Sequence, residues 1–252
     1  MKRFYKDVSV AEVPPSPGGR GQAGEAGLGE GEKPRFQILL DGKPVRTPAG
    51  NPLALPTRAL AEAIAEEWRG QGETVDPVSM PFLKLANTVI DGVAVGRAEV
   101  IAAILRFGEN DLLCYRAHQP PDLAARQAES WDPVLAWARR RFGVDFTLVE
   151  GFAHADQPPQ TLAAFRAALE GQDSFSLAAL HVIASIAGSV VLALALAEGE
   201  LTPAQIFTLS RVDEDYQAGK WGRDQEAEVR AASLARELDK AAAFIKASQR
   251  DT

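Results

Sequence analysis

The sequence predicts an α+β protein, with a small β-rich amino-terminal domain followed by a larger all-helical carboxy-terminal domain. Residues 1–56 contain short alternating apolar and polar runs broken by Gly, Pro, Asn and Asp, a pattern typical of strands and turns. From residue 57 onward, apolar side chains recur three, four and seven positions apart, which is typical of helices. We expect the β-rich domain to cover residues 1–56, with 57–95 as a candidate extension, and the helical domain to cover 96–252.

Two strands are predicted in the β-rich domain, at residues 4–13 and 36–40, where β-branched and aromatic side chains alternate with polar ones. Residues 14–34 between them are dominated by Gly, Pro and Glu and can bury almost nothing, so we expect a flexible insertion. A hairpin tolerates such an insertion because the entropy of loop closure grows only logarithmically with loop length. The dipeptide Asp41-Gly42 predicts a tight turn after the second strand.

The helical region begins at Thr57, a plausible N-cap for a helix whose buried stripe includes Leu60, Ile64 and Trp68. Pro133 lies within a long helical pattern and is expected to kink that helix or to start a new one. The other predicted helices, in order, begin at residue 81 or cover residues 97–107, 121 onward, 161–169, 174–197, 202–216 and 223–248.

The composition is that of an ordinary globular protein, with 46% hydrophobic and 24% charged residues in a chain of 252. The formal net charge of −7 provides no broad positive field for binding nucleic acid or an anionic membrane. A single cysteine, Cys114, excludes an intramolecular disulfide and fits a reducing compartment. The amino terminus has no apolar run of the kind found in secretory signals. We therefore expect a bacterial cytoplasmic protein.

Residues 177–197 carry no Asp, Glu, Lys or Arg and are long enough to cross a membrane. They are rich in alanine, contain His181 and two serines, and are flanked by acidic residues without a cationic anchor. A buried central helix is the favoured interpretation, because helices that are apolar on every side occupy the middle of helical domains. A membrane-associated scaffold remains as an alternative.

No motif for phosphate, dinucleotide or nucleophilic chemistry is present, and the histidines lack metal-ligand spacing. A structural zinc site is therefore excluded, and these motifs assign no residue a catalytic, cofactor or metal role. The acidic run Asp213-Glu214-Asp215 is the most distinctive cluster, and it is followed by Tyr216, Gln217 and Trp221. Three interpretations stay open: a solvated helix end, a recognition surface with aromatic anchors, or a metal-dependent enzyme site that also uses Asp224.

Several segments, taken together and in order, resemble the assembly chaperones of F₁-ATPase that bind the ATP synthase alpha subunit in mitochondria and α-proteobacteria. The segments are FYKDVSV at 4–10, LDGKPVRTP at 40–48, LALPT at 53–57, EEW at 66–68, LANTVIDG at 85–92, DLLCYR at 111–116, ARQ at 125–127, WDP at 131–133, DEDYQ at 213–217 and KWG at 220–222. The resemblance spans nearly the whole chain.

The resemblance implies a chaperone without catalytic activity or cofactor, with the same division into a β-rich and a helical domain. Such a protein holds the free alpha subunit and shields its beta-facing surface until the beta subunit displaces it. It implies a monomer when free, with no nucleic acid, membrane or small-molecule partner. The partner-binding residues it implies are Glu214, the best match to an acidic residue required in the family, then Asp213, Asp215, Tyr216, Gln217 and Trp221, with Trp68 as a match to a family tryptophan.

Overall fold

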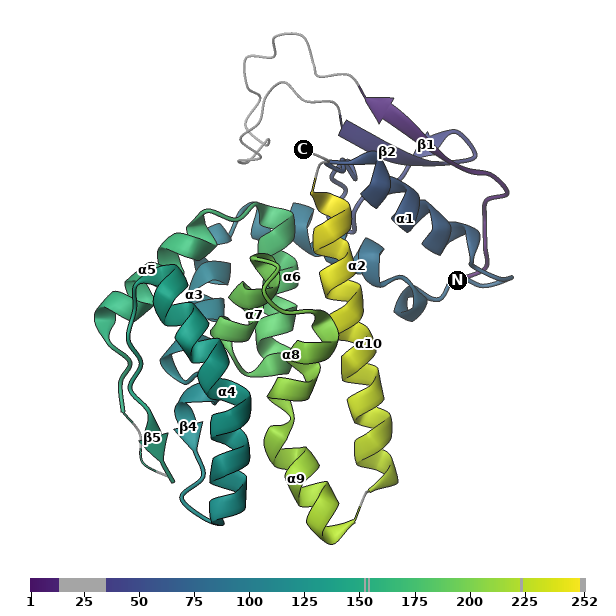
Figure 1. Ribbon diagram of the computed structural model, residues 1–252. Coiled ribbons are helices and arrows are strands. Elements are labelled where there is room, and N and C mark those ends of the chain that lie inside the picture. The colour runs from purple at the N-terminus through teal and green to yellow at the C-terminus, as the bar shows by residue number, and fades with distance from the viewer. Residues whose placement is uncertain (14–34, 152, 154, 223, 250–252) are drawn as a thin grey trace. The chain divides into compact units, whose positions relative to one another are not determined.

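The computed structural model describes residues 1–13, 35–151, 153, 155–222 and 224–249 (Figure 1). The insertion predicted over residues 14–34 lies outside the described residues. The chain forms two compact units. The first comprises Met1–Arg97, Ser174–Ala179 and Ala243–Thr252, and the second comprises Ala98–Asp173 and Leu180–Ala242. A small sheet followed by a mainly helical chain confirms the predicted α+β class.

The elements follow one another in the order in which they are labelled. The strands are β1 (Val8–Val13), β2 (Arg35–Leu40), β3 (Lys43–Pro44), β4 (Tyr115–Arg116) and β5 (Val149–Glu150). The helices are α1 (Arg58–Arg69), α2 (Pro81–Thr88), α3 (Arg97–Glu109), α4 (Pro121–Phe142), α5 (Pro159–Glu170), α6 (Ser174–Ala187), α7 (Val190–Ala197), α8 (Pro203–Ser210), α9 (Val212–Trp221) and α10 (Gln225–Ser248). Short helical turns are η1 (Pro77–Ser79), η2 (Val89–Val93) and η3 (Leu112–Cys114).

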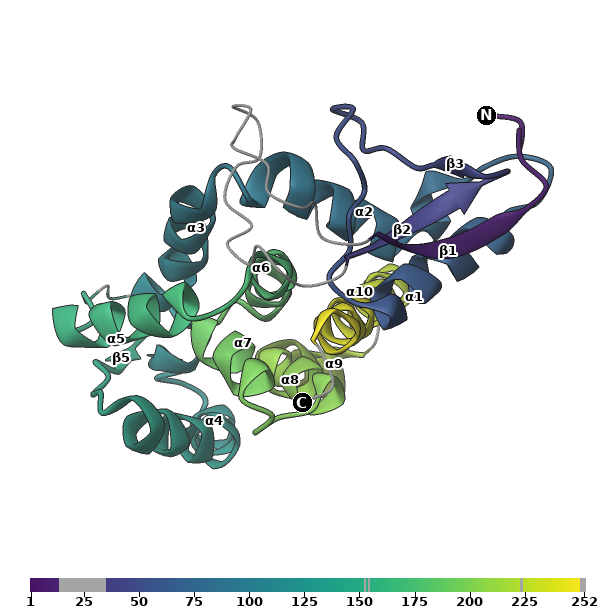
Figure 2. The ribbon, with the colours of Figure 1, turned by 90° about the horizontal axis from the view of Figure 1, so that it is seen from above.

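The sheet of the first unit is antiparallel, in the order β1-β2-β3 (Figure 2). Val8 pairs with Leu40 at one end of the β1–β2 ladder and Val13 with Arg35 at the other. The turn from β2 to β3 is Asp41-Gly42, and both residues have positive φ, as a tight two-residue hairpin turn requires. The Asp41 carboxylate also accepts hydrogen bonds from the backbone N–H groups of Lys6 and Asp7. The two predicted strands and their turn are therefore confirmed, although the first strand begins at Val8 rather than at residue 4.

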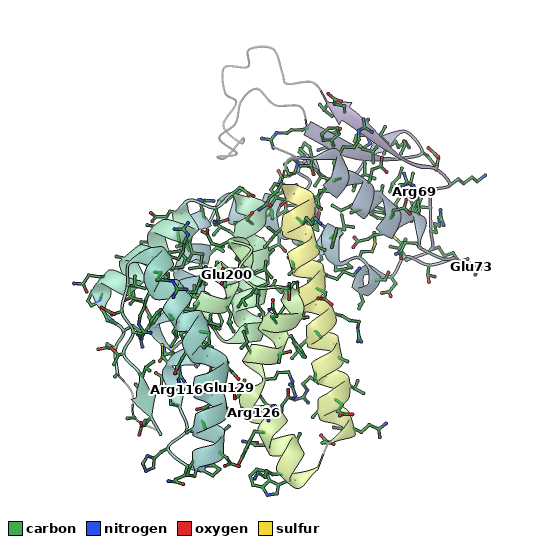
Figure 3. All side chains as sticks on the ribbon, viewed as in Figure 1. Arg69, Glu73, Arg116, Arg126, Glu129 and Glu200 are labelled. Carbon is green, nitrogen blue, oxygen red and sulfur yellow. The ribbon has the colours of Figure 1, made fainter. Side chains whose placement is uncertain are left out.

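Helix α1 packs against β1 and β2 and begins as predicted at Thr57, whose hydroxyl accepts from the Leu60 N–H at 3.0 Å. Arg69, labelled in Figure 3, lies at the other end of this helix and attaches it to the sheet. Its guanidinium donates hydrogen bonds to the backbone carbonyl of Val8 in β1. The Glu67 carboxylate accepts from the first two N–H groups of α2, at 2.8 and 2.9 Å. Since the residue before α2 provides no side-chain cap, Glu67 supplies it from the neighbouring helix.

The first unit also includes two short segments from the later part of the chain, Ser174–Ala179 and Ala243–Thr252. Phe244, near the end of α10, contributes to the core of this unit. Its buried ring lies 5.7 Å from that of Phe82 in an edge-to-face contact and 6.0 Å from that of Phe175 in a stacked one. These three aromatic rings join α2 with the start of α6 and the end of α10 in one apolar cluster.

The single helix predicted over residues 174–197 is wrong, because the chain forms two helices, α6 and α7. Gly188 adopts a positive φ of 63°, and the Ser189 hydroxyl then caps α7 by accepting from the Leu192 N–H at 3.1 Å. The side chains of α7 from Val190 to Ala195 are buried, as expected of a central helix. Among the described residues, no helix is both long and apolar enough to cross a membrane.

Two further helix boundaries differ from prediction. The pattern over residues 202–216 also forms two helices, α8 and α9, which are interrupted at Arg211. Conversely, α4 runs through Pro133 as one helix rather than starting anew there. Proline has no N–H, so one backbone hydrogen bond is missing at that point, and the surrounding helix tolerates the loss.

The second unit is built around a buried carboxylate. Asp111 is 1% exposed, and its carboxylate accepts from the Leu113 N–H and the Val191 N–H, each at 3.1 Å, so that it caps both η3 and the start of α7. Burial raises the pKa of Asp111 to about 6, against the lowering effect of hydrogen bonds from Ser189 and nearby backbone N–H groups. Cys114 lies in the same core, and burial raises the pKa of its thiol to about 12, so the thiol stays neutral.

Candidate functional site

The acidic run begins helix α9 rather than ending a helix. Asp213, Glu214 and Asp215 occupy its first turn, where the exposed backbone N–H groups carry partial positive charge and stabilise carboxylates. Successive helical residues point about 100° apart, so three adjacent carboxylates face three directions. Each of the three therefore has different surroundings.

Asp213 faces helix α4, which lies beside α9 (Figure 1). Its carboxylate accepts a hydrogen bond from the side-chain amide of Gln127 at 2.7 Å. Gln127 is buried, and its amide oxygen accepts in turn from the Ala117 N–H at 2.7 Å. The short strand β4 is also attached to α4, because the guanidinium of Arg116 (labelled in Figure 3) pairs with the carboxylate of Asp132 at 2.8 Å. Asp213 thus serves to hold α9 in position.

Tyr216 makes the second attachment of α9 to α4. Its hydroxyl donates to the Asp122 carboxylate at 2.7 Å, and the Lys220 ammonium lies 3.1 Å from the other oxygen of that carboxylate. The hydrogen bonds from Tyr216 and Lys220 lower the pKa of Asp122, and Asp122 raises the pKa of Lys220. Just before α9, the Trp131 indole N–H of α4 donates to the Leu209 carbonyl at 2.8 Å. Side chains of α4 therefore fix both the start and the end of α9.

Glu214 and Trp221 lie on the opposite face of α9. Residues 214, 218 and 221 follow a spacing of four and then three, which places them in one stripe along a helix. Trp221 is 79% exposed, and Ala218 between the two is half-buried. We call this stripe, with the exposed Gln217 beside it, the α9 outer face. It presents a carboxylate and an indole on a helix that α4 holds rigidly from behind.

Asp215 and Glu214, the two exposed acids at the start of α9, differ in whether they form an ion pair. Asp215 lies 3.5 Å from the guanidinium of Arg211, one turn earlier on the chain. Glu214 is exposed and has no hydrogen bond or ion pair within the described residues. Of the three adjacent acids, Glu214 is therefore the one whose charge is available to a partner.

Trp68 lies in the first unit and is a core residue. Its side chain is 8% exposed, its ring makes an edge-to-face contact with that of Tyr5 at 5.4 Å, and its carbonyl accepts from the Tyr5 hydroxyl at 2.6 Å. A ring buried in this way cannot reach a partner at the surface, so we place no binding role on Trp68.

The sequence-based candidates are thus divided by the fold. Glu214, Gln217 and Trp221 share an exposed surface, whereas Asp213 and Tyr216 hold the helix. Asp122 and Gln127, which provide the other half of these attachments, were missed as site residues. The motif at 125–127 marked Gln127 without indicating its role. Within the part of the chain that the structure describes, no group of three or more His, Cys, Asp or Glu side chains is arranged to hold a metal ion.

The attachment through Gln127 can be tested by substitution. Replacing Gln127 with alanine leaves the half-buried Ala117 N–H without this acceptor and removes the hydrogen bond to Asp213, so we expect the free energy of unfolding to fall by about 2 kcal/mol. Backbone amides of α9 should then exchange with deuterium faster than in the unmodified protein. Denaturant unfolding and exchange by mass spectrometry measure both effects, and unchanged exchange in α9 would contradict the anchoring role.

Comparisons with known proteins agree with one another. The ATP12 family profile, described as "ATP12 chaperone protein", matches residues 2–139. Mitochondrial protein atp12 of Schizosaccharomyces pombe is 26% identical over 203 residues, which cover 75% of this chain and 69% of the relative. Atp12 from Paracoccus denitrificans is 37% identical, with a TM-score of 0.85 and 98% of each chain covered.

Two further solved structures match at the same TM-score of 0.85. One is an aspartate-to-lysine mutant of the Paracoccus denitrificans protein, at 36% identity and with 98% of each chain covered. The other is the Atu1473 protein from Agrobacterium tumefaciens, at 47% identity, covering 99% of this chain and 86% of the other. The family profile covers more than half of the sequence and the solved structures cover nearly all of it. The chain therefore belongs to the ATP12 chaperone family.

Proposed function

We propose that this protein is an assembly chaperone for the F₁ sector of ATP synthase. It binds the free alpha subunit, shields the surface that later contacts the beta subunit, and leaves when beta replaces it. It acts by binding alone, without a catalytic step or a cofactor. Membership of the ATP12 chaperone family and the resemblance of segments along the whole sequence support this proposal.

The observation that carries the proposal furthest is the α9 outer face. Exposed tryptophans are frequent energetic anchors of protein interfaces, and Trp221 is fixed on a helix that needs no ordering before it binds. The carboxylate of Glu214 on the same stripe has no ion pair within the described part of the chain, so it gives the interface a charge that selects a partner and speeds its approach. The other acids and Tyr216 stabilise the helix that presents these two side chains.

A surface of this kind suits the task of covering an isolated subunit and then releasing it. A subunit isolated from its complex exposes apolar area that normally is buried, and such area promotes aggregation. A chaperone must cover this area and yet release it, which favours an interface of moderate size with polar contacts at its rim. An exposed indole on the same helix stripe as an exposed carboxylate fits a releasable contact better than an extended apolar surface does.

Displacement by the beta subunit tests the proposal. We expect the purified complex of this protein with the alpha subunit to dissociate when beta is added, with alpha eluting together with beta on size exclusion and the chaperone eluting alone. Bovine serum albumin at the same concentration is the control and should leave the complex intact. A stable ternary complex would contradict shielding of the beta-facing surface.

A further inference from the structure

The first turns of α10 form a helix although their side chains are not buried against other elements. Every residue from 225 to 230 is exposed, including Ala227 and Val229, and the first fully buried side chain of the helix is Leu238. An N-cap and favourable charges at the helix start stabilise these turns in place of burial. The Asp224 carboxylate accepts from the Ala227 N–H at 3.1 Å as an N-cap, and Glu226 and Glu228 lie in the first turn, where negative charge is favourable.

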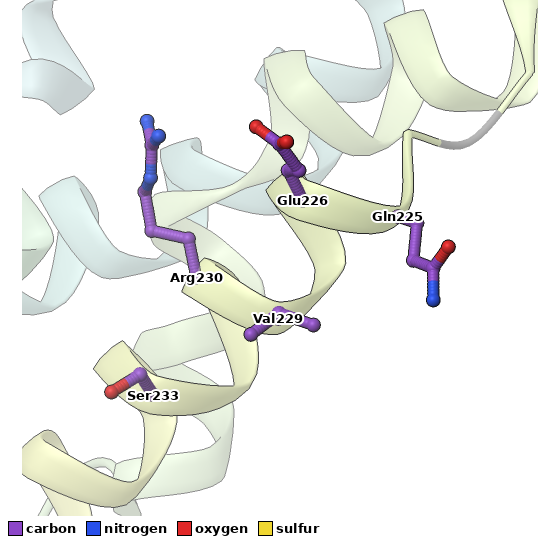
Figure 4. Close-up of a pocket in the computed structure, with 5 residues that line it drawn as sticks. All are labelled: Gln225, Glu226, Val229, Arg230 and Ser233. Carbon is purple, nitrogen blue, oxygen red and sulfur yellow. The ribbon is translucent and has the colours of Figure 1, made fainter.

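A shallow, open hollow of about 390 Å³, called the groove of α10 below, lies between side chains on this exposed part of the helix. Its lining residues are Gln225, Glu226, Val229, Arg230 and Ser233, which repeat every four residues on one side of the helix (Figure 4). Val229, 64% exposed, is the apolar residue in the middle, and the side chains of Glu226 and Arg230 project to the same side of the helix. The groove therefore has an apolar centre and a charged border.

The groove follows the α9 outer face closely along the chain. Only residues 222–224 separate Trp221 at the end of α9 from Gln225 at the start of α10. Two large exposed hydrophobic side chains, Trp221 and Val229, therefore lie on successive helices, eight residues apart in the sequence. Neighbouring exposed apolar side chains rimmed by polar ones are typical of protein interaction sites.

The charge of this region indicates what it binds. Between residues 213 and 230 the sequence has six carboxylates and three cations. Of the cations, Lys220 is engaged by Asp122. The carboxylates of Glu214 and Glu226 border the exposed indole and the groove. A segment with Lys or Arg next to an aliphatic or aromatic side chain complements this surface, whereas a second copy of the same acidic surface would be repelled.

We propose that the α9 outer face and the groove of α10 form one docking surface for a basic amphipathic segment of the partner. This inference rests on the proposed function, in which the partner is the alpha subunit. Val229 and Trp221 bury the apolar side of the segment, and Glu214 and Glu226 pair with its cations. The exposed turns of α10 become buried only in the complex.

Substitution of Val229 tests the surface in the full-length protein. In Val229→Asp the apolar centre is lost and a carboxylate is added, so we expect the Kd for the alpha subunit to rise about tenfold. Val95→Asp is the matched control, since Val95 is also an exposed valine (73%) but lies in the first unit, and its Kd should change less than about twofold. Equal melting temperatures would establish that both variants are folded.

Two further readouts separate the outcomes. Amides of residues 225–231 should exchange rapidly in the free protein and become protected in the complex, and raising the salt concentration should weaken binding of the unmodified protein more than that of Glu226→Lys. Unchanged affinity of Val229→Asp, or no protection, would overturn this inference and leave the proposed function intact. Failure of the unmodified protein to bind alpha would instead overturn the proposed function. A dimer that Val229→Asp converts to a monomer would identify a second copy as the occupant and also overturn the inference.

Discussion

Replacement of Asp111 with alanine is expected to lower the free energy of unfolding by about 3 kcal/mol, because the buried N–H groups of Leu113 and Val191 each lose their acceptor. These N–H groups belong to η3 and to the start of α7, whose side chains form much of the core of the second unit. Urea unfolding followed by circular dichroism measures the change. A loss below about 1 kcal/mol would show that water or backbone rearrangement satisfies these groups.

The raised pKa of Asp111 also predicts a dependence of stability on pH. Between about pH 4 and pH 6 the folded protein keeps this carboxyl protonated while the unfolded chain has already ionised it. The folded state therefore binds more protons in this window, and the contribution of Asp111 to stability falls as the pH rises, by about 3 kcal/mol in total. Asp111→Asn has no such titration, so the stability difference between the two proteins should change between pH 4 and 6 and level off above pH 7.

Reversal of the charge at Glu214 is expected to have the largest effect on binding. Glu214→Lys places a cation where the partner's own cations are expected, so the affinity for the alpha subunit should fall by about tenfold or more. The side chain is exposed and has no hydrogen bond or ion pair within the described residues, so the melting temperature should stay within a few degrees of its original value. Isothermal titration calorimetry and a thermal melt measure the two quantities.

Glu99→Lys is the matched control for this charge reversal. Glu99 is exposed and lies in the first turn of α3, so its replacement incurs the same unfavourable interaction with a helix N-terminus. It should leave binding unchanged. Equal losses of affinity in the two variants would mean that net charge, rather than the position of Glu214, governs the interaction.

Much of the fold could be predicted from local pattern, and the errors have identifiable causes. The hairpin of β1 and β2 and the start of α1 at Thr57 follow from residue types that act through their immediate neighbours. The break between α6 and α7 does not, because the apolar pattern continues across it. Gly188 and Ser189 signal a break only weakly by themselves, and the backbone is fixed there by Asp111, which lies about 80 residues earlier in the sequence.

The sequence segment that contains the candidate site was predictable, but which of its side chains form an exposed surface was not. Composition and resemblance led to residues 213–221, yet they could not divide them into anchoring and exposed side chains. That division depends on where α9 begins and on its contacts with Asp122 and Gln127 of α4, which are long-range. The exposed turns of α10 were missed because Val229 lies in an ordinary helical pattern, and only its unpacked surroundings distinguish it.

Co-expression with the alpha subunit tests the central claim most directly. The alpha subunit would be produced alone, with this protein, and with its Glu214→Lys variant, and the soluble fraction of each culture would be separated by size exclusion. We expect soluble alpha to accumulate with the unmodified protein, to co-elute with it, and to be strongly reduced with the variant. Alpha that is equally soluble in all three cultures, or that elutes apart from this protein, would contradict the proposed chaperone function.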